Sequence, residues 1–267
     1  SNATVEGAVA AKNGDTGIAV RSGSGRILDS RIEENSRGVR FEDASDVTLR
    51  DTTVVGNAHN GLDIQDCANA TISSNLVERN GNAGVSFRSS SGRVRSNRIE
   101  GNSASGLLFR SGTAEARDNE ILNNRNGLRL ESSQVNASGN LVASNTNYGV
   151  QMGVGSMRSR IRADNTIRDN GRDSSMGIIE DTLQGEVVWN EQNHTDLDPV
   201  VTEAISIEDS GALILDPGTV VKLDASARMD VRGELRANGT TSRPVYFTSV
   251  KDDSLGGDTN RDDHAAE

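Results

Sequence analysis

Aromatic and other apolar residues are scarce in this sequence. Aromatic residues make up 3% and hydrophobic residues 33% of its 267 residues, whereas a soluble domain is usually about 45–50% apolar. Such values indicate either a disordered chain or a thin core that is repeated many times. Disordered chains are usually rich in proline, but this chain has 3 prolines and 28 glycines. We therefore expect a repeated core.

Cysteine, long apolar runs and positive charge are also in short supply. Cys67 is the only cysteine, so an internal disulfide is excluded and the residue is expected to be a small buried side chain. Apolar runs are only a few residues long, which is too short to insert into a membrane. The net charge of -11 argues against nucleic acid as a partner, because nucleic acid requires a basic surface.

The sequence does contain a repeat of about 22 residues. A glycine followed by an apolar, a variable and an apolar residue recurs at Gly17, Gly38, Gly61, Gly84, Gly106, Gly127 and Gly149. An asparagine column precedes these glycines at Asn35, Asn57, Asn80, Asn102, Asn124, Asn145 and Asn170. A third column consists of Ser30, Thr52, Asn75, Asn97, Asn119, Asn140 and Asn165. Three columns that stay in phase over seven copies indicate a repeat architecture.

The repeat predicts an all-β solenoid. Apolar residues alternate after each glycine, which is typical of a short strand with one buried face. One repeat is long enough for a coil turn of two or three strands, and successive turns would stack at roughly 4.8 Å. The buried column would contain Val20, Phe41, Ile64, Phe87, Phe109, Leu130 and Met152. We therefore predict a single-stranded parallel β-helix with about 22 residues per turn.

The asparagine columns are expected at the corners of the coil. Asparagine tolerates the left-handed backbone conformation that a sharp corner requires. Stacked turns would also place each side-chain amide over the next, so that the amides form a hydrogen-bonded ladder. We therefore expect both columns to stabilise the coil, and we do not expect them to coordinate ions.

The glycine-containing strands and the asparagine corners resemble the right-handed parallel β-helix repeats of pectate-lyase-like secreted proteins. The resemblance covers about residues 15–180 and implies that the coil is right-handed. It leaves the function open, because this fold occurs in lyases, hydrolases, epimerases and non-catalytic stalks.

The last third of the chain has a different pattern. Its segments 217–222, 233–237 and 244–249 resemble β-helix turns found in large secreted and surface proteins of bacteria. We divide the chain into a tag remnant (1–3), a regular β-helix (4–180), an irregular polar connector (181–203) and further β-helix turns (204–267). The resemblance implies an extracellular or cell-surface location, a longer parent protein and an open coil end at the C-terminus that can contact a partner.

The acidic C-terminal loop is a candidate calcium site. Asp258, Asn260 and Asp262 place oxygen ligands at alternate positions, as in the first half of a calcium-binding loop. The pattern lacks the usual glycine, whose place Asp263 takes. A solvated acidic tail without an ion is the alternative.

The outward positions of the repeated strand are the candidate binding surface. We expect vertical ion pairs between Arg21 and Glu42, between Arg40 and Asp63, and between Arg110 and Glu131, which would make an ordinary solubilising surface. Arg88 and Arg110 instead would lie one turn apart with the same charge. The candidate ligand-binding residues are Arg40, Asp63, Arg88, Arg110 and Arg129, because arginines can bind the carboxylates of an acidic polysaccharide in pairs of hydrogen bonds.

Two functions are compatible with this surface. The first is a non-catalytic scaffold that serves in adhesion or contacts polysaccharide, which is favoured because the repeats are too uniform to build the walls of a cleft. The second is a polysaccharide lyase or epimerase, for which Asp63, Arg88 and Arg110 are weak catalytic candidates. The histidines His59, His194 and His264 form no recognisable catalytic set.

Overall fold

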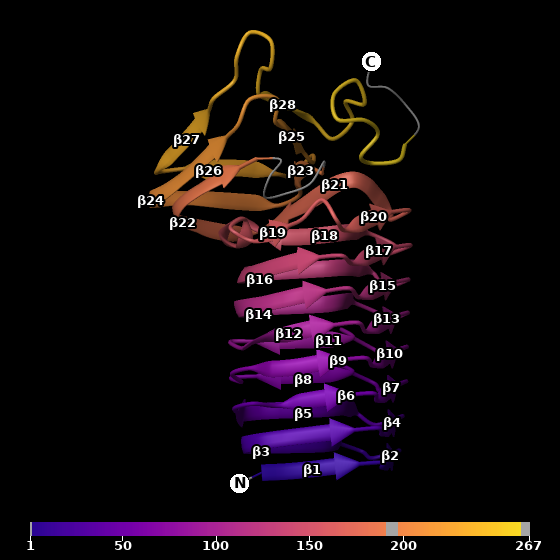
Figure 1. Ribbon diagram of the computed structural model, residues 1–267. Coiled ribbons are helices and arrows are strands. Elements are labelled where there is room, and N and C mark those ends of the chain that lie inside the picture. Colours follow the sequence, from indigo (N-terminus) through magenta and orange to yellow (C-terminus); the bar gives the residue numbers. More distant parts are fainter. Residues whose placement is uncertain (1, 191–196, 263–267) are drawn as a thin grey trace.

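The chain folds into a long stack of β-coils. The computed structural model describes residues 2–190 and 197–262, and its strands pair in parallel from one turn to the next. The N-terminus lies at one end of the stack and the C-terminal strands lie at the other (Figure 1). The predicted parallel β-helix is confirmed.

The first ladder of the coil contains eleven strands in the described part of the chain. They are β3 (Thr16–Leu28), β5 (Arg37–Ala44), β8 (Leu62–Gln65), β11 (Val85–Arg88), β14 (Ser105–Arg117), β16 (Asn126–Ser138), β18 (Tyr148–Gly153), β21 (Arg172–Ile179), β23 (Asp198–Val201), β25 (Val220–Leu223) and β28 (Tyr246–Ser249). The second halves of the long strands β3, β14 and β16 belong to a second ladder. It is completed by β1 (Asn2–Glu6), β6 (Thr48–Arg50), β9 (Ala70–Ser73), β12 (Ser91–Arg95) and β19 (Arg160–Ile161).

A third ladder closes each regular turn with a strand of three residues. Its members are β2 (Val9–Ala11), β4 (Arg31–Glu33), β7 (Thr53–Val55), β10 (Leu76–Glu78), β13 (Arg98–Glu100), β15 (Glu120–Leu122), β17 (Leu141–Ala143) and β20 (Thr166–Arg168). A separate sheet near the C-terminus contains β22 (Asp181–Trp189), β24 (Ala204–Leu215), β26 (Arg228–Val231) and β27 (Glu234–Ala237). One short 3-10 helix, η1, covers Val154–Ser156.

The predicted apolar column stacks in the core, with one side chain from each turn. Phe41 pairs with Ile64, which pairs with Phe87, and Phe87 pairs with Phe109 in the register of the first ladder. These side chains are at most 2% exposed. The rings of Phe87 and Phe109 are tilted, with centroids 5.1 Å apart. Each turn adds only a few further apolar side chains to the core, for example Val39, Leu49 and Val54, which explains the low apolar content.

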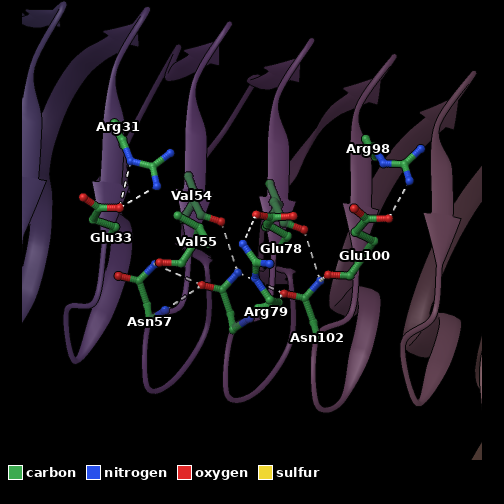
Figure 2. Close-up of polar contacts among 12 residues, drawn as sticks. Arg31, Glu33, Val54, Val55, Asn57, Glu78, Arg79, Arg98, Glu100 and Asn102 are labelled. Carbon is green, nitrogen blue, oxygen red and sulfur yellow. Dashed lines mark hydrogen bonds and ion pairs between the residues drawn. The ribbon is translucent and has the colours of Figure 1, made fainter.

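The first asparagine column forms a continuous hydrogen-bonded ladder. Each amide Nδ2 donates to the Oδ1 of the asparagine one turn later, at 2.9–3.2 Å from Asn35 to Asn170. The backbone N–H of each asparagine donates to the same oxygen. Figure 2 shows the section of the ladder that contains Asn57 and Asn102. Asn13, which sequence reasoning missed, extends the ladder by donating to Asn35 at 2.8 Å.

The expected left-handed conformation of these asparagines was wrong. The positive φ angles fall on the residue before each ladder member, for example Arg79 (φ 51) before Asn80 and Ser96 (φ 55) before Asn97. The left-handed residue turns the chain sharply, and the next side chain can then lie inside the coil, where its amide meets those of the adjacent turns.

The expected irregular connector at residues 181–203 was also wrong where the structure describes it. Strand β22 pairs with β24 along most of its length, and β23 pairs with β21 and β25. Leu183, Val187 and Trp189 are buried in the core. The register shifts between Leu183 and Gly185, and this irregularity hides the alternation of apolar residues in the sequence.

Candidate functional site

The coil brings the predicted ligand-binding residues onto one outward surface. Arg40 and Asp63 are neighbours in the register of β5 and β8. Arg88 of β11 pairs with Arg110 of β14, so that these two arginines lie one turn apart, as expected. Arg129 lies further along the stack, on β16.

The expected ion pair between Arg40 and Asp63 was wrong. The Nη2 of Arg40 lies 2.7 Å from Glu42 Oε1 on its own strand and 3.5 Å from Gln65 Oε1. Residues two apart on a strand share a face, so Glu42 is within easy reach of the guanidinium. Asp63 is 9% exposed, and its Oδ1 has no hydrogen-bond partner.

Arg110 and Arg129 share one carboxylate. Glu131 accepts a hydrogen bond of 2.6 Å from Nε of Arg110 and one of 2.7 Å from Nε of Arg129. This confirms the expected pair of Arg110 and Glu131. Burial acts to raise the pKa of Glu131, but the hydrogen bonds from the two guanidinium groups outweigh it and hold that pKa below its usual value.

Beside this group lies a surface hollow that we call the arginine hollow, with a volume of about 440 Å³. Its lining includes the four arginines Arg110, Arg125, Arg129 and Arg172, together with Tyr148 and the acids Glu203 and Asp224. Among the side chains that the structure describes, neither Arg125 nor Arg172 forms an ion pair. An acidic protein therefore carries a locally cationic hollow on the outward side of its first ladder.

Three of these lining residues, Arg125, Tyr148 and Arg172, were missed by sequence reasoning. Arg125 follows the ladder residue Asn124 directly, and Arg172 follows Asn170 by two positions. Backbone hydrogen bonds link Asn147 to Arg125 and Arg172 to Asn147, which places the two arginines in one corner column. The sequence signal that could have identified them is an arginine one or two positions after a ladder asparagine. We had interpreted these corners as purely structural.

Tyr148 is the most deeply buried polar residue of the hollow that lacks a partner. Its side chain is 3% exposed, and its Oη has no hydrogen-bond partner. The guanidinium carbon of Arg172 lies over the ring, 5.8 Å from its centroid. Burial raises the pKa of Tyr148 to about 12, with Arg172 opposing this shift and Asp224 adding to it. The phenol therefore remains a hydrogen-bond donor at neutral pH.

A larger hollow on the second ladder, of about 830 Å³, is chemically less promising. Arg158 is held by the backbone oxygens of Gln184 and Glu186. Arg93 lies 3.7 Å from Glu115. Because two of the three arginines that line this hollow, Arg93 and Arg158, are already engaged, we take the arginine hollow as the candidate site.

The C-terminal loop gathers the predicted calcium ligands. Carboxylate oxygens of Asp253, Asp258 and Asp262 lie within 4.8 Å of one another. Asn260 donates to Asp262 at 2.6 Å, while its Oδ1 and the Oδ1 of Asp253 have no hydrogen-bond partner. The sequence therefore predicted two of these three carboxylates and missed Asp253. Asp263 lies outside the described residues.

Lys222 anchors this loop to the coil. Its side chain is fully buried, and its Nζ donates to the backbone oxygen of Gly257 at 2.5 Å. Burial lowers the pKa of Lys222, and Asp253 and Asp198 oppose that shift. Burial also raises the pKa of Asp198 to about 6, against the effect of Lys222. The loop thus covers the continuation of the outward surface at the last turns.

The other reactive side chains that the sequence offered give no second site. Cys67 is buried, as expected, and burial raises the pKa of its thiol. His194 and His264 lie outside the described residues. Across residues 2–190 and 197–262, the chain contains no helix with the length and apolar character of a membrane span.

Comparison with known proteins places the chain in a family. A model described as "Right handed beta helix region" matches residues 1–119 and 88–197. The "Protein bark beetle" of Drosophila melanogaster is 35% identical over 79 residues, which are 28% of this chain and 2% of that protein. This chain therefore spans only a small part of that relative.

Solved structures of a periplasmic alginate epimerase, AlgG, are similar over part of their length. A double mutant aligns with a TM-score of 0.45 at 16% identity, covering 85% of this chain and 50% of that one. The unmodified enzyme aligns with a TM-score of 0.42 at 20% identity, covering 78% and 50%. Since the family model covers more than half of the chain and the strands coil in parallel, this protein belongs to the right-handed β-helix family.

Proposed function

We propose that this β-helix is a non-catalytic scaffold that contacts acidic polysaccharide through the arginine hollow. It would serve as a module of a secreted or cell-surface protein. The observation that carries the proposal is the convergence of four arginines from neighbouring turns on one hollow, in a chain whose net charge is -11. A polyanion would approach such a protein against its overall charge and would be held only where guanidinium groups are concentrated.

The position of the weak catalytic candidates supports a binding role over catalysis. Asp63, the candidate base, is buried and is not part of the hollow's lining. Arg110 is occupied by Glu131. A base must lie within hydrogen-bond reach of the proton that it removes, and Asp63 lies two turns away from Leu108 of the lining, beyond such reach of a sugar unit held in the hollow.

Charge reversal tests the proposal. The double variant Arg125→Glu with Arg172→Glu should lose at least about tenfold in affinity for polygalacturonate or alginate, because attraction becomes repulsion. The matched control is Arg26→Glu with Arg95→Glu, two exposed arginines outside the hollow that form no ion pair with a described side chain. Equal affinity of both double variants for the polymer would refute the site.

A polysaccharide lyase or epimerase is the alternative function, with Asp63, Arg88 and Arg110 as its catalytic residues. Arg88 and Arg110 do lie one turn apart, so they could together neutralise a uronate carboxylate. Release of unsaturated uronate products, or a change in the ratio of uronate epimers in the recovered polymer, would establish the enzyme and overturn the scaffold.

We also propose that calcium stabilises the C-terminal loop through Asp253, Asp258 and Asp262. Hard oxygen ligands of this kind suit Ca²⁺, and the unpartnered oxygen atoms of Asp253 and Asn260 could complete its coordination.

Contact through the C-terminal coil end is a separate expectation. There Val231, Tyr246 and Phe247 are 38–45% exposed, and measuring the protein's mass against concentration would reveal self-association.

A further inference from the structure

Two hydrogen-bond donors in the arginine hollow lack acceptors. The Oη of Tyr148 and the Nη1 of Arg172 are both shielded from solvent, and neither has a hydrogen-bond partner. A buried polar group without a partner costs roughly 1–3 kcal/mol, and native proteins contain few of them. Two such groups on residues that are paired in register therefore require an explanation, and a ligand that supplies the missing acceptor is one.

The surrounding coil holds the two groups together. Tyr148 of β18 is paired in register with Arg172 of β21. The tyrosine ring lies directly over Gly177, where a β-carbon would come within 2.9 Å of the ring carbons. The ring is thus fixed from one side by the glycine, while the guanidinium of Arg172 lies over it. The arrangement depends on glycine at position 177.

The chemistry of the two groups selects an anion. Arginine is a donor only, and a protonated phenol can donate one hydrogen bond. A carboxylate accepts two hydrogen bonds in a fixed planar geometry, one on each oxygen, and such charge-assisted bonds are the strong ones. A neutral sugar hydroxyl has two acceptor lone pairs and could also accept from both donors, but without the negative charge that makes the bonds to a carboxylate strong.

The charges around the hollow limit how many anions it can hold. Glu131 already occupies Arg110 and Arg129. Glu203 and Asp224 also line the hollow, and Asp224 lies close enough to Tyr148 to act on its pKa. Both acids would repel a densely charged polymer. Arg125 and Arg172 are the cations that remain, which fits a polymer with isolated carboxylates better than a heavily sulfated one.

We infer that Tyr148 and Arg172 bind one carboxylate of a uronic acid residue, and that Tyr148 makes the hollow selective for this group. This inference rests on the proposed polysaccharide-binding function and names the part of the ligand that is recognised. Because both donors are shielded in the free protein, binding must be accompanied by a local movement that opens them to the ligand.

Replacing Tyr148 with phenylalanine tests the inference, since only the hydroxyl is lost. A galacturonate hexamer should bind Tyr148→Phe about tenfold more weakly than the wild type, as expected for the loss of a hydrogen bond to a charged group. The fully methyl-esterified hexamer, which has no free carboxylate, should bind both proteins equally. The melting temperature of Tyr148→Phe should be equal to or above that of the wild type, because the removed hydroxyl has no partner in the free protein.

Tyr246→Phe is the matched control, because Tyr246 is 38% exposed on β28, outside the hollow. Arg172→Gln is the second variant and should weaken binding of the free acid while leaving binding of the ester unchanged. If the wild type binds the free acid and Tyr148→Phe binds it equally well, the inference is overturned while the proposed function survives. If the wild type binds no uronate polymer, both are overturned.

Discussion

Arg110 donates a hydrogen bond of 2.6 Å to Glu131 on the following turn. Arg129, on the same strand as Glu131, donates to its other oxygen at 2.7 Å. The carboxylate thus fixes two arginines of neighbouring turns at the edge of the arginine hollow, and it also neutralises part of their charge. Glu131 should therefore stabilise the fold and at the same time weaken the binding of an anionic ligand.

Replacing Glu131 with glutamine should lower stability and raise affinity for a polyuronate. Because the pKa of Glu131 is lowered by folding, its contribution is present above pH 4.5 and disappears as the pH falls through the folded-state pKa. We expect a loss of about 1 kcal/mol at pH 7, measured by denaturant unfolding, and a smaller loss at a pH well below 4.5. An equal loss at both values would show that the ionised carboxylate is not responsible.

The asparagine ladder should be cooperative along the coil. Asn102→Ala removes hydrogen bonds to Asn80 and Asn124 and leaves buried partners unsatisfied, so we expect a loss of about 3 kcal/mol in the free energy of unfolding. Asn13→Ala at the exposed end of the ladder should cost less than about 1 kcal/mol. Similar losses for the two variants would contradict a stabilising role of the stacked amides.

The corner residues should respond to glycine in a predictable direction. Ser96 has φ 55 before Asn97, and at the other corner of the same turn Gly101 has φ 63 before Asn102. Ser96→Gly should raise the free energy of unfolding by up to about 1 kcal/mol, and Gly101→Ser should lower it by a similar amount, because a β-carbon strains the left-handed conformation. Thermal unfolding of both variants measures this, and a loss of stability in Ser96→Gly would argue against strain at the corner.

Calcium should raise the melting temperature if the C-terminal loop binds it. At a hundredfold excess over the dissociation constant, the stabilisation would be about 2.7 kcal/mol, and EDTA should remove it. Asp258→Asn should abolish the response. The control Asp66→Asn, an exposed acid at a left-handed corner, should retain it. A melting temperature that is the same in calcium and in EDTA excludes the site.

The sequence was sufficient to predict the coil because its signals are local and repeated. The alternation after Gly61 and Gly84, the buried phenylalanines and the asparagine ladder each recur at one period, so every copy supports the others. The strand β22 was missed because its register shift between Leu183 and Gly185 breaks the alternation. The positions of the left-handed residues were predicted wrongly because we attributed the left-handed conformation to the asparagine itself, whereas the residue before it adopts that conformation.

The candidate site could be predicted only in part. Arg110 and Arg129 lie on the repeated strand, where the period gives their positions. Arg125, Tyr148 and Arg172 come from corners and from a turn with an irregular register, so their convergence depends on how three turns stack. The partnerless hydroxyl of Tyr148 is a three-dimensional property, and no sequence pattern indicates it.

The central claim is that the arginine hollow holds an acidic polysaccharide without changing it. Calorimetric titration with a defined galacturonate oligomer, followed by mass and NMR analysis of the recovered sugar, tests this most directly. We predict saturable binding that weakens as salt is added and that is lost in the Arg125→Glu, Arg172→Glu variant, with the oligomer recovered unchanged. No binding by the wild type, or recovery of shortened, unsaturated or epimerised sugar, would contradict it.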